Sequence, residues 1–271
     1  MTKGNQPTDD GNFILTPEQR DEMLSKDPSV APLIHRYLGA KDFLNGKPVR
    51  YCLWLKDVPP SAYSKNKEIM RRIAAIHDFR LKSSAAPTRK SAETAFKFFS
   101  TPQKEGRFIV VPEVSSERRK YIPIGVMENG VIASNKLTII MAEDSFIFGV
   151  LTSSAHMAWT RVVAGRLKSD YQYSGGVVYN NFPWPDADEE SKAKIRKTAQ
   201  QILDARNKSA DTSLADLYNE LTMPIELRKA HEANDKAVLA AYGLKKDATE
   251  EEIVAHLFTL YADKVKGQKN A

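Results

Sequence analysis

The sequence has one cysteine in 271 residues, Cys52, so it offers no pair for an internal disulfide. Such usage is typical of the reducing cytoplasm, where we expect this protein to lie, and the apolar residues around Cys52 favour a small buried hydrophobe over a nucleophile. No apolar run approaches the roughly 18 residues that a membrane span requires. Residues 1–11 are polar and unlike a signal peptide, and we interpret them, together with residues 267–271, as disordered ends.

Several motifs of enzyme chemistry are missing as well. No Gly-x-Gly-x-x-Gly follows a strand-like run, which argues against a dinucleotide-binding turn, and no Gly-x-x-x-x-Gly-Lys-Ser/Thr loop is present to hold nucleotide phosphates. Gly-x-Ser-x-Gly is also absent. The histidines are scattered, and none lies at metal-ligand spacing from another His or Cys, so the sequence predicts no metal site: His35, His77, His156, His231 and His256.

One pattern is similar to that of metal-dependent nucleases, because Pro185-Asp186 precedes Glu190-Ser191-Lys192 as in Pro-Asp … Glu-x-Lys. In those enzymes the acidic pair lies on adjoining strands, whereas here the spacing is a single turn at the head of a predicted helix. Acidic residues are favoured there by the helix dipole. We therefore favour a helix cap followed by a solvated acidic face, and keep a small nuclease that uses Asp186, Glu190 and Lys192 as the alternative.

The sequence does contain enough apolar residues to form hydrophobic cores, since 42% of the residues are hydrophobic. Its length favours two domains. Lys and Arg number 40 against 34 Asp and Glu, which gives a formal net charge of +6. That excess permits a polyanionic partner but does not require one.

The N-terminal part combines helix and strand signals. Thr16 and Gln19 form a capping box around Pro17, and Ile69, Ile73 and Ile76 recur at helical spacing within residues 64–82. A strand is predicted over residues 49–55, after the turn dipeptide Asn-Gly at 45–46. Two further short helices are expected, around residues 33–37 and 92–99.

The centre of the chain is strand-rich. Strand-like runs cover residues 107–114, 120–127, 131–141, 145–151, 169–173 and 177–179, and a helix is predicted from residue 153 or 154 to about 167. Pro183 and Pro185 stop any regular element, and everything after them is typical of helix. In that part Asp186 is the expected cap of one helix, and Thr249 with Glu252 forms a capping box.

These patterns predict an α+β protein. Residues 1–185 are expected to form a mixed or antiparallel sheet with flanking helices, preceded by a helical lead-in, and residues 186–271 a small all-helical domain.

Residues 115–125, Ser-Ser-Glu-Arg-Arg-Lys-Tyr-Ile-Pro-Ile-Gly, resemble the central stretch of target recognition domains in MmeI-type fused restriction-modification enzymes. So do residues 154–171 and 178–185, the latter reading Val-Tyr-Asn-Asn-Phe-Pro-Trp-Pro. The earlier segment 45–55 also matches. The resemblance runs nearly end to end, and the helical C-terminal part is similar to the terminal helical domain of that family.

In that family one long chain carries a nuclease domain, an adenine-specific methyltransferase domain and this recognition region. The resemblance implies double-stranded DNA as partner, and S-adenosylmethionine and magnesium as cofactors of the parent enzyme. The Gly-rich cofactor turn and the Asn-Pro-Pro-Tyr motif have no counterpart here, since Val58-Pro59-Pro60-Ser61 lacks the amide and the aromatic ring. We therefore expect no cofactor and no methyl transfer for this chain alone. It would serve the methyltransferase and nuclease domains of the parent chain, or join a separate methyltransferase as a specificity subunit.

The residues around position 170 have the alternation of a strand with one polar and one aromatic face, because Lys168, Asp170 and Gln172 alternate with Ser169, Tyr171 and Tyr173. Lys can donate to guanine and Asp can accept from the cytosine amino group, so Lys168 and Asp170 suit a G·C pair. The resemblance implies base reading by the same three polar residues together with Glu113, Asn135 and Lys136, where Glu113 and Asn135 would cover another pair. The alternative is a solvent-facing edge of an ordinary sheet.

Phosphate contacts are expected from basic residues beside this sheet. The candidates are Arg80, Lys82, Arg89, Lys90, Arg118, Arg119, Lys120, Arg161 and Arg166. The densest cluster is 118–120, and solvated charge is the alternative for each. Met157, Trp159, Tyr171 and Tyr173 are interpreted as core or interdomain packing.

Overall fold

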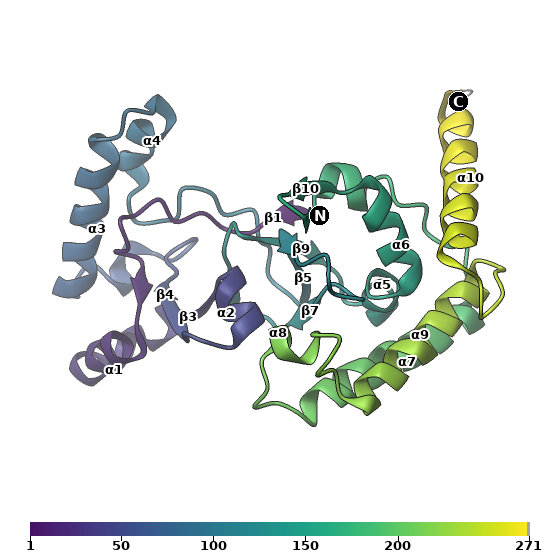
Figure 1. Cartoon of the computed structure of the whole chain (residues 1–271). Coiled ribbons are helices and arrows are strands. Elements are labelled where there is room, and N and C mark those ends of the chain that lie inside the picture. The colour runs from purple at the N-terminus through teal and green to yellow at the C-terminus, as the bar shows by residue number, and fades with distance from the viewer. Residues whose placement is uncertain (270–271) are drawn as a thin grey trace. The chain divides into compact units, whose positions relative to one another are not determined.

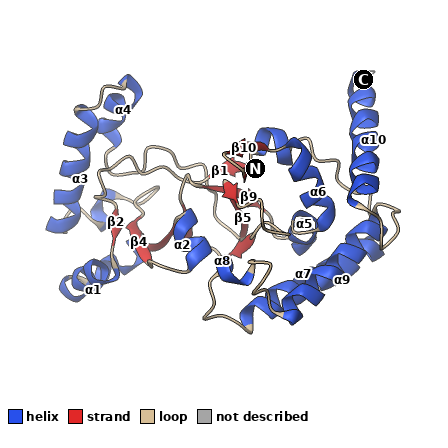
Figure 2. Cartoon of the chain, in the orientation of Figure 1, coloured by secondary structure: helices blue, strands red, loops and turns tan. Residues whose placement is uncertain are grey.

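The computed structural model describes residues 1–269 and divides the chain into two compact units. Unit 1 comprises Met1, residues 107–127 and the chain from 140 onward, and unit 2 comprises residues 2–106 and 128–139. Both units combine helices and strands, and the last part of unit 1 is helical (Figures 1 and 2). The predicted α+β class is confirmed.

Unit 2 contains a four-stranded sheet with the order β2-β4-β3-β8. Its strands are β2 (Ile14–Leu15), β3 (Ile34–Leu38), β4 (Arg50–Leu53) and β8 (Val131–Ala133). β4 pairs antiparallel with β2 and β3, whereas β3 and β8 are parallel. The sheet covers a core that includes Phe13, Leu15, Cys52 and Ile69, all fully buried, so the predicted burial of Cys52 is confirmed.

Four α-helices accompany this sheet: α1 (Pro17–Lys26), α2 (Ala40–Asn45), α3 (Lys67–Leu81) and α4 (Ala86–Lys90). The capping box of α1 is confirmed, because Thr16 accepts from the backbone of Gln19 while the Gln19 side chain accepts from the backbone of Thr16. The helix predicted around Ile69 and Ile76 is also confirmed as α3.

Three predictions for unit 2 are wrong. The segment expected as a short helix around residues 33–37 is strand β3, and the helix expected over 92–99 is only a 3-10 turn, Ser91–Thr94. Residues 1–11 are not a disordered lead-in. Thr2 and Lys3 form β1, which pairs with the first half of β9 (Leu137–Met141), and Asn5 is fully buried with its side chain bonded to Gln103 and Ala133.

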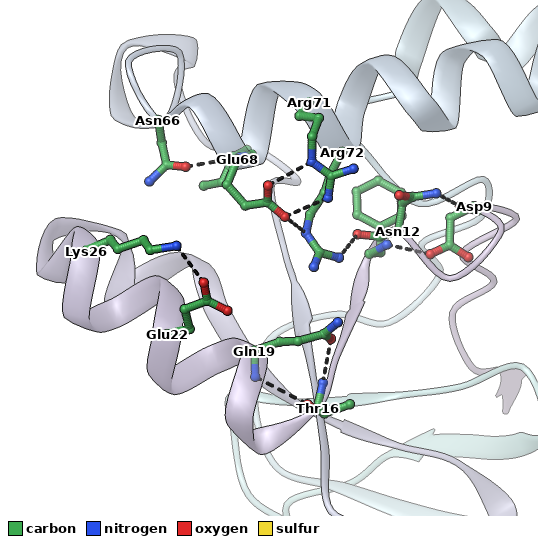
Figure 3. A network of polar contacts seen from close by, with 12 residues as sticks. Asp9, Asn12, Thr16, Gln19, Glu22, Lys26, Asn66, Glu68, Arg71 and Arg72 are labelled. Carbon is green, nitrogen blue, oxygen red and sulfur yellow. Dashed lines mark hydrogen bonds and ion pairs between the residues drawn. The ribbon is translucent and has the colours of Figure 1, made fainter.

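At the start of α3, Glu68 is the centre of a polar cluster (Figure 3). Its carboxylate accepts from Arg71 and from Arg72 at 2.8 Å each, while Asn66 caps the helix. Hydrogen bonds from the Arg71 guanidinium are the main cause that lowers the pKa of Glu68 to about 2, and Arg72 adds to the effect.

The Glu68→Gln variant is expected to lose stability in a pH-dependent way. The native pKa lies below the unfolded one, so the ionised carboxylate stabilises the fold above about pH 4, and this contribution fades as the pH falls toward 2. Because the side chain is 40% exposed, solvent screening reduces the effect to about 1 kcal/mol. Denaturant titrations at pH 7 and pH 3 should show the difference from wild type shrinking at the lower pH. An equal difference at both would contradict this assignment.

Unit 1 contains two small groups of strands. β5 (Phe108–Pro112) pairs antiparallel with β7 (Gly125–Met127), and a three-stranded antiparallel sheet has the order β10-β11-β6. The members of that sheet are β6 (Val114–Ser115), β10 (Gly165–Leu167) and β11 (Asp170–Gln172). Strand β9 begins in unit 2 and ends in unit 1.

The helices of unit 1 are α5 (Ser145–Leu151), α6 (Ser154–Val163), α7 (Glu189–Asn207), α8 (Leu214–Leu217), α9 (Ile225–Ala241) and α10 (Glu250–Lys269). α7 packs along α9 and against α5. Buried Phe148 and Trp159 share one core with Ile195 and Leu227, and the predicted burial of Met157 and Trp159 is confirmed. That core draws on residues from both sides of position 186, and the predicted domain boundary at 185/186 stays a prediction. Among residues 1–269, no helix has the length and apolar character to cross a membrane.

Several predicted boundaries in this part are wrong. The strand expected over 145–151 is helix α5, capped by Asp144, and the one expected over 177–179 is part of a single π-helical turn, Gly175–Tyr179. The run 131–141 is split into two strands by a turn at 134–136, and only the end of the run 120–127 is a strand. In the helical part, Asp188 rather than Asp186 caps α7, whereas the Thr249–Glu252 capping box is confirmed. Residues 267–269, expected to be disordered, continue α10, and 270–271 lie outside the described residues.

Candidate nucleic-acid interface

The candidate interface is the three-stranded sheet of unit 1. Its register shows from which face of the sheet each strand residue projects. Leu167 lies opposite Asp170 and Arg166 opposite Tyr171 in the β10–β11 hairpin, and Tyr171 lies opposite Ser115 of β6. Directly opposed residues project from the same face of a sheet, and neighbours along a strand project from opposite faces. One face therefore carries Arg166, Tyr171 and Ser115.

That face points into the core of unit 1. Tyr171 and Tyr173 are buried, which confirms the predicted packing role of the aromatic residues. The Arg166 guanidinium lies 4.0 Å from the centre of the Tyr171 ring, and the Tyr173 hydroxyl lies 2.9 Å from Nε2 of buried His156. Burial lowers the pKa of His156 to about 3, so this histidine is neutral at physiological pH. The inward face thus fixes β11 in place.

The opposite, outward face carries Asp170 and Gln172, as the polar alternation predicts, and Gln172 is exposed. Lys168 does not continue this strand. It lies in the two-residue turn 168–169, with φ of 58°, because Leu167 and Asp170 already close the hairpin. Its exposed side chain therefore projects from the tip of the hairpin instead of from a strand face.

Asp170 connects the hairpin to the basic loop 116–120. Its Oδ1 accepts a hydrogen bond of 3.3 Å from the backbone N–H of Glu117. Arg119, two residues further on, is half-buried; this burial lowers the pKa of its guanidinium, and the nearby Asp170 carboxylate opposes the shift. The loop that carries the densest basic cluster is therefore bonded to β11 at Asp170.

The basic candidates of unit 1 differ in what else they contact. Arg118 and Lys120 are exposed on the loop. Arg161 forms an ion pair of 2.7 Å with Glu250 of α10, and Arg166 donates to the backbone oxygens of Ser169 and Arg161. Arg161 and Arg166 thus have structural partners inside unit 1, and the Lys120 ammonium lies 5.5 Å from the centre of the Tyr121 ring. Arg118 is the exposed cation of this loop that we consider first for a phosphate contact.

Other candidates belong to unit 2. Lys82, Arg89 and Lys90 are exposed near the end of α3 and along α4. The prediction that Arg80 contacts a phosphate is wrong, because its side chain is fully buried. The guanidinium donates to five backbone oxygens, at 2.9–3.2 Å: those of Pro7, Thr8, Ser91, Thr94 and Lys97. In this structure it cannot reach a phosphate.

The remaining base-reading candidates lie at two places in the chain. Glu113 of unit 1 lies between β5 and β6, where its backbone oxygen accepts from Tyr173 N–H at 2.8 Å. Asn135 and Lys136 of unit 2 form the turn between β8 and β9, and Lys136 is exposed. The structure therefore brings Asp170, Gln172 and Lys168 together on one hairpin, while Asn135 and Lys136 share a separate turn.

Sequence reasoning missed two features of the site. The exposed Leu167 shares the outward face with Asp170, and His156 holds Tyr173 beneath it. The first depends on the two-residue turn 168–169, which carries no Asn-Gly or Asp-Gly signal in the sequence. The second depends on α6 packing under the sheet, which no local pattern indicates.

The residues of the alternative nuclease pattern lie on the surface at the start of α7. Asp186 is exposed, Glu190 pairs with Lys194 at 2.7 Å, and Lys192 pairs with Glu189 at 2.8 Å. In the part of the chain that the structure describes, no three His, Cys, Asp or Glu side chains are grouped so as to hold a metal ion.

Comparison with known proteins identifies relatives for nearly the whole chain. The protein named DNA methyltransferase A of Bacillus subtilis (strain 168) is 40% identical over 260 residues, which are 96% of this chain and 29% of that protein. A solved structure described as the Type IIL restriction-modification enzyme MmeI in complex with DNA matches with a TM-score of 0.91 and 42% identity, over 98% of this chain and 35% of that one. This chain thus spans about a third of the length of the proteins it matches.

Two family models together match residues 1–268 without a gap. The model described as "MmeI, target recognition domain" matches residues 1–186, and the one described as "MmeI, C-terminal domain" matches residues 187–268. This chain therefore belongs to the MmeI family, of which it carries the target recognition domain and the C-terminal domain.

Proposed function

We propose that this chain is a sequence-specific DNA recognition module, which selects the target site for methyltransferase and endonuclease domains and has no catalytic centre of its own. The observation that carries the proposal is the outward face of the β10-β11-β6 sheet. There Asp170 and Gln172 share a rigid face with Lys168 at its tip, and the basic loop 116–120 adjoins it.

The comparisons support this proposal. The similar solved structure is described as a complex with DNA, and the curated relative is named a DNA methyltransferase. Methyl transfer needs S-adenosylmethionine and cleavage needs magnesium. We propose that the methyltransferase and endonuclease domains of such an enzyme bind them. For this chain we propose no cofactor.

A hairpin of this size can enter the major groove, where each base pair presents its own pattern of donors and acceptors. The Lys168 ammonium is suited to guanine O6 and N7, and the Asp170 carboxylate to the cytosine amino group. Exposed cations on the adjoining loop would contact phosphates, which fixes the register without reading sequence. Glu113, Asn135, Lys136 and Gln172 remain proposed contacts to further bases.

The direct test is selection of bound duplexes from a random pool by the full 271-residue chain. We expect one consensus sequence to be enriched, and a duplex of that sequence to bind more tightly than a scrambled duplex of the same composition. Equal binding of the two duplexes would contradict the proposal.

Replacing Arg118 by Ala is expected to weaken binding to every sequence alike, because a phosphate contact carries no sequence information. The slope of log K against log salt should become shallower by about 0.9 for each phosphate that the side chain neutralises. Titrations of the selected and scrambled duplexes at several salt concentrations measure both effects. Lys229→Ala, which removes a cation from α9, is the matched control and should leave both slopes unchanged.

The nuclease alternative is tested by incubating DNA with the chain and magnesium. The proposal predicts that the DNA stays intact over many hours. Cleavage that disappears in the Glu190→Ala variant would instead assign catalysis to the acidic start of α7.

A further inference from the structure

The outward face of the hairpin carries one apolar side chain, Leu167. It lies directly opposite Asp170, so the two side chains project from the same face of the sheet. Leu167 is 54% exposed, although it is one of the largest aliphatic residues. The face proposed to contact bases therefore presents an isobutyl group beside a carboxylate.

The residues on either side of Leu167 in the hairpin are held by contacts of their own. On its N-terminal side, Arg166 turns to the inward face, stacks on Tyr171 and donates to two backbone oxygens. Across the hairpin, Asp170 is tied to the backbone of Glu117. A side chain on so constrained a backbone loses little conformational freedom on binding, which favours specific contact.

Beside Leu167, the outward face of β10 carries no second side chain. The next residue on the same face of β10 is Gly165, opposite Gln172, where a methyl group would lie 3.7 Å from Gln172 Oε1. The Gln172 side chain is the neighbour of that position. A base edge that the leucine contacts from the side would therefore also meet the Gln172 amide.

We propose that Leu167 is a further specificity-determining residue, which recognises a thymine through its C5-methyl group in the major groove. The methyl group is the one apolar feature that base pairs display in that groove, and an apolar side chain is its natural contact. The thymine would lie beside the base pair contacted by Lys168 and Asp170. This inference rests on the proposed function.

The test removes single methyl groups from the DNA. In the duplex selected by the full chain, each thymine is replaced in turn by uracil, which pairs identically but lacks the C5-methyl. Wild type is expected to lose about three- to fivefold in affinity at one position, the effect of burying one methyl group. Leu167→Asn should bind the thymine duplex with a similar loss and should not distinguish uracil from thymine there.

Two further variants serve as controls for the uracil experiment. Leu167→Met keeps an apolar side chain and should retain the uracil effect. Val162→Asn removes an apolar side chain that is 53% exposed on α6 of the same unit, and it should behave as wild type.

The inference is wrong if no uracil replacement weakens wild-type binding, or if Leu167→Asn still responds to it. The scrambled duplex, titrated alongside, separates this failure from that of the proposed function. If binding does not depend on any thymine methyl group but still prefers the selected duplex, only the proposed role of Leu167 is wrong. If both duplexes bind equally, the proposed sequence recognition is wrong as well.

Discussion

Exchanging the charges at positions 168 and 170, as Lys168→Glu with Asp170→Arg, is expected to change the preferred base pair at one position of the target. Each bidentate base contact discriminates by about 1–3 kcal/mol. The original pair should thus lose about 10- to 100-fold in relative affinity. Arginine at position 170 prefers guanine where aspartate accepted from cytosine, so we expect the pair to invert. Selection from random duplexes, followed by competition titration, measures the change.

The exchange has a structural side effect that a single variant isolates. Asp170 also accepts from the backbone of Glu117 and opposes the charge of Arg119, so arginine at position 170 could displace the basic loop. Asp170→Asn keeps the shape and the acceptor oxygen. It should relax discrimination at the same base pair while leaving the affinity for scrambled DNA close to wild type.

A matched control exists on α7, where Glu190 and Lys194 form an exposed ion pair of 2.7 Å. Glu190→Arg with Lys194→Glu exchanges charges in the same unit without altering net charge. This variant should select the wild-type sequence. If the 168/170 exchange also selects the wild-type sequence, the hairpin does not contact the bases.

The hairpin around Tyr171 shows why the site was only partly predictable. Alternation correctly separated the polar from the buried face, because that pattern is set by strand geometry alone. The turn at Lys168 has no Asn-Gly or Asp-Gly signal, and a lysine with φ of 58° is rare enough that nothing local indicates it. Alternation alone therefore extends the polar face of the strand two residues too far, to Lys168.

Helix α5 illustrates a second limit. Its sequence, Ser-Phe-Ile-Phe-Gly-Val-Leu, is a short apolar run in which Phe148, Gly149 and Val150 are all buried. A short run of apolar residues has no polar face, so periodicity cannot separate a strand from a helix. Only its packing against α7 and α9 decides. Local capping signals, by contrast, were sufficient for α1, where Thr16 and Gln19 satisfy each other.

The prediction for Arg80 is wrong although a usable signal is present in the sequence. Arg80 continues the stripe of Ile69, Ile73 and Ile76 at the next helical spacing, so its position on α3 faces the core. A charged residue type favours exposure in general. In this case the guanidinium replaces a hydrophobic residue at the end of the stripe and binds backbone oxygens of two other segments.

Replacing Arg80 by Ala is therefore expected to destabilise unit 2 by about 4 kcal/mol, which is in the range reached when a buried hydrogen-bonding network is broken. All five N–H groups of the side chain are used, and the partners lie in residues 7–8 and 91–97. Without the guanidinium, these buried carbonyl oxygens lose their donors. Hydrogen exchange of the α3 amides, followed by mass spectrometry, reports unit 2 separately from unit 1.

The conservative variant Arg80→Lys separates the contribution of charge from that of donor geometry. Arg80→Lys keeps the charge, but the lysine ammonium has three donors at one point and cannot reach oxygens spread around a planar fork. We expect Arg80→Lys to be nearly as unstable as Arg80→Ala. Arg71→Ala, on the exposed side of the same helix, should cost under about 1 kcal/mol, since its partner Glu68 is solvated. Exchange rates in Arg80→Lys that match wild type would show that charge, and not the five-donor geometry, holds the N-terminal segment against α3.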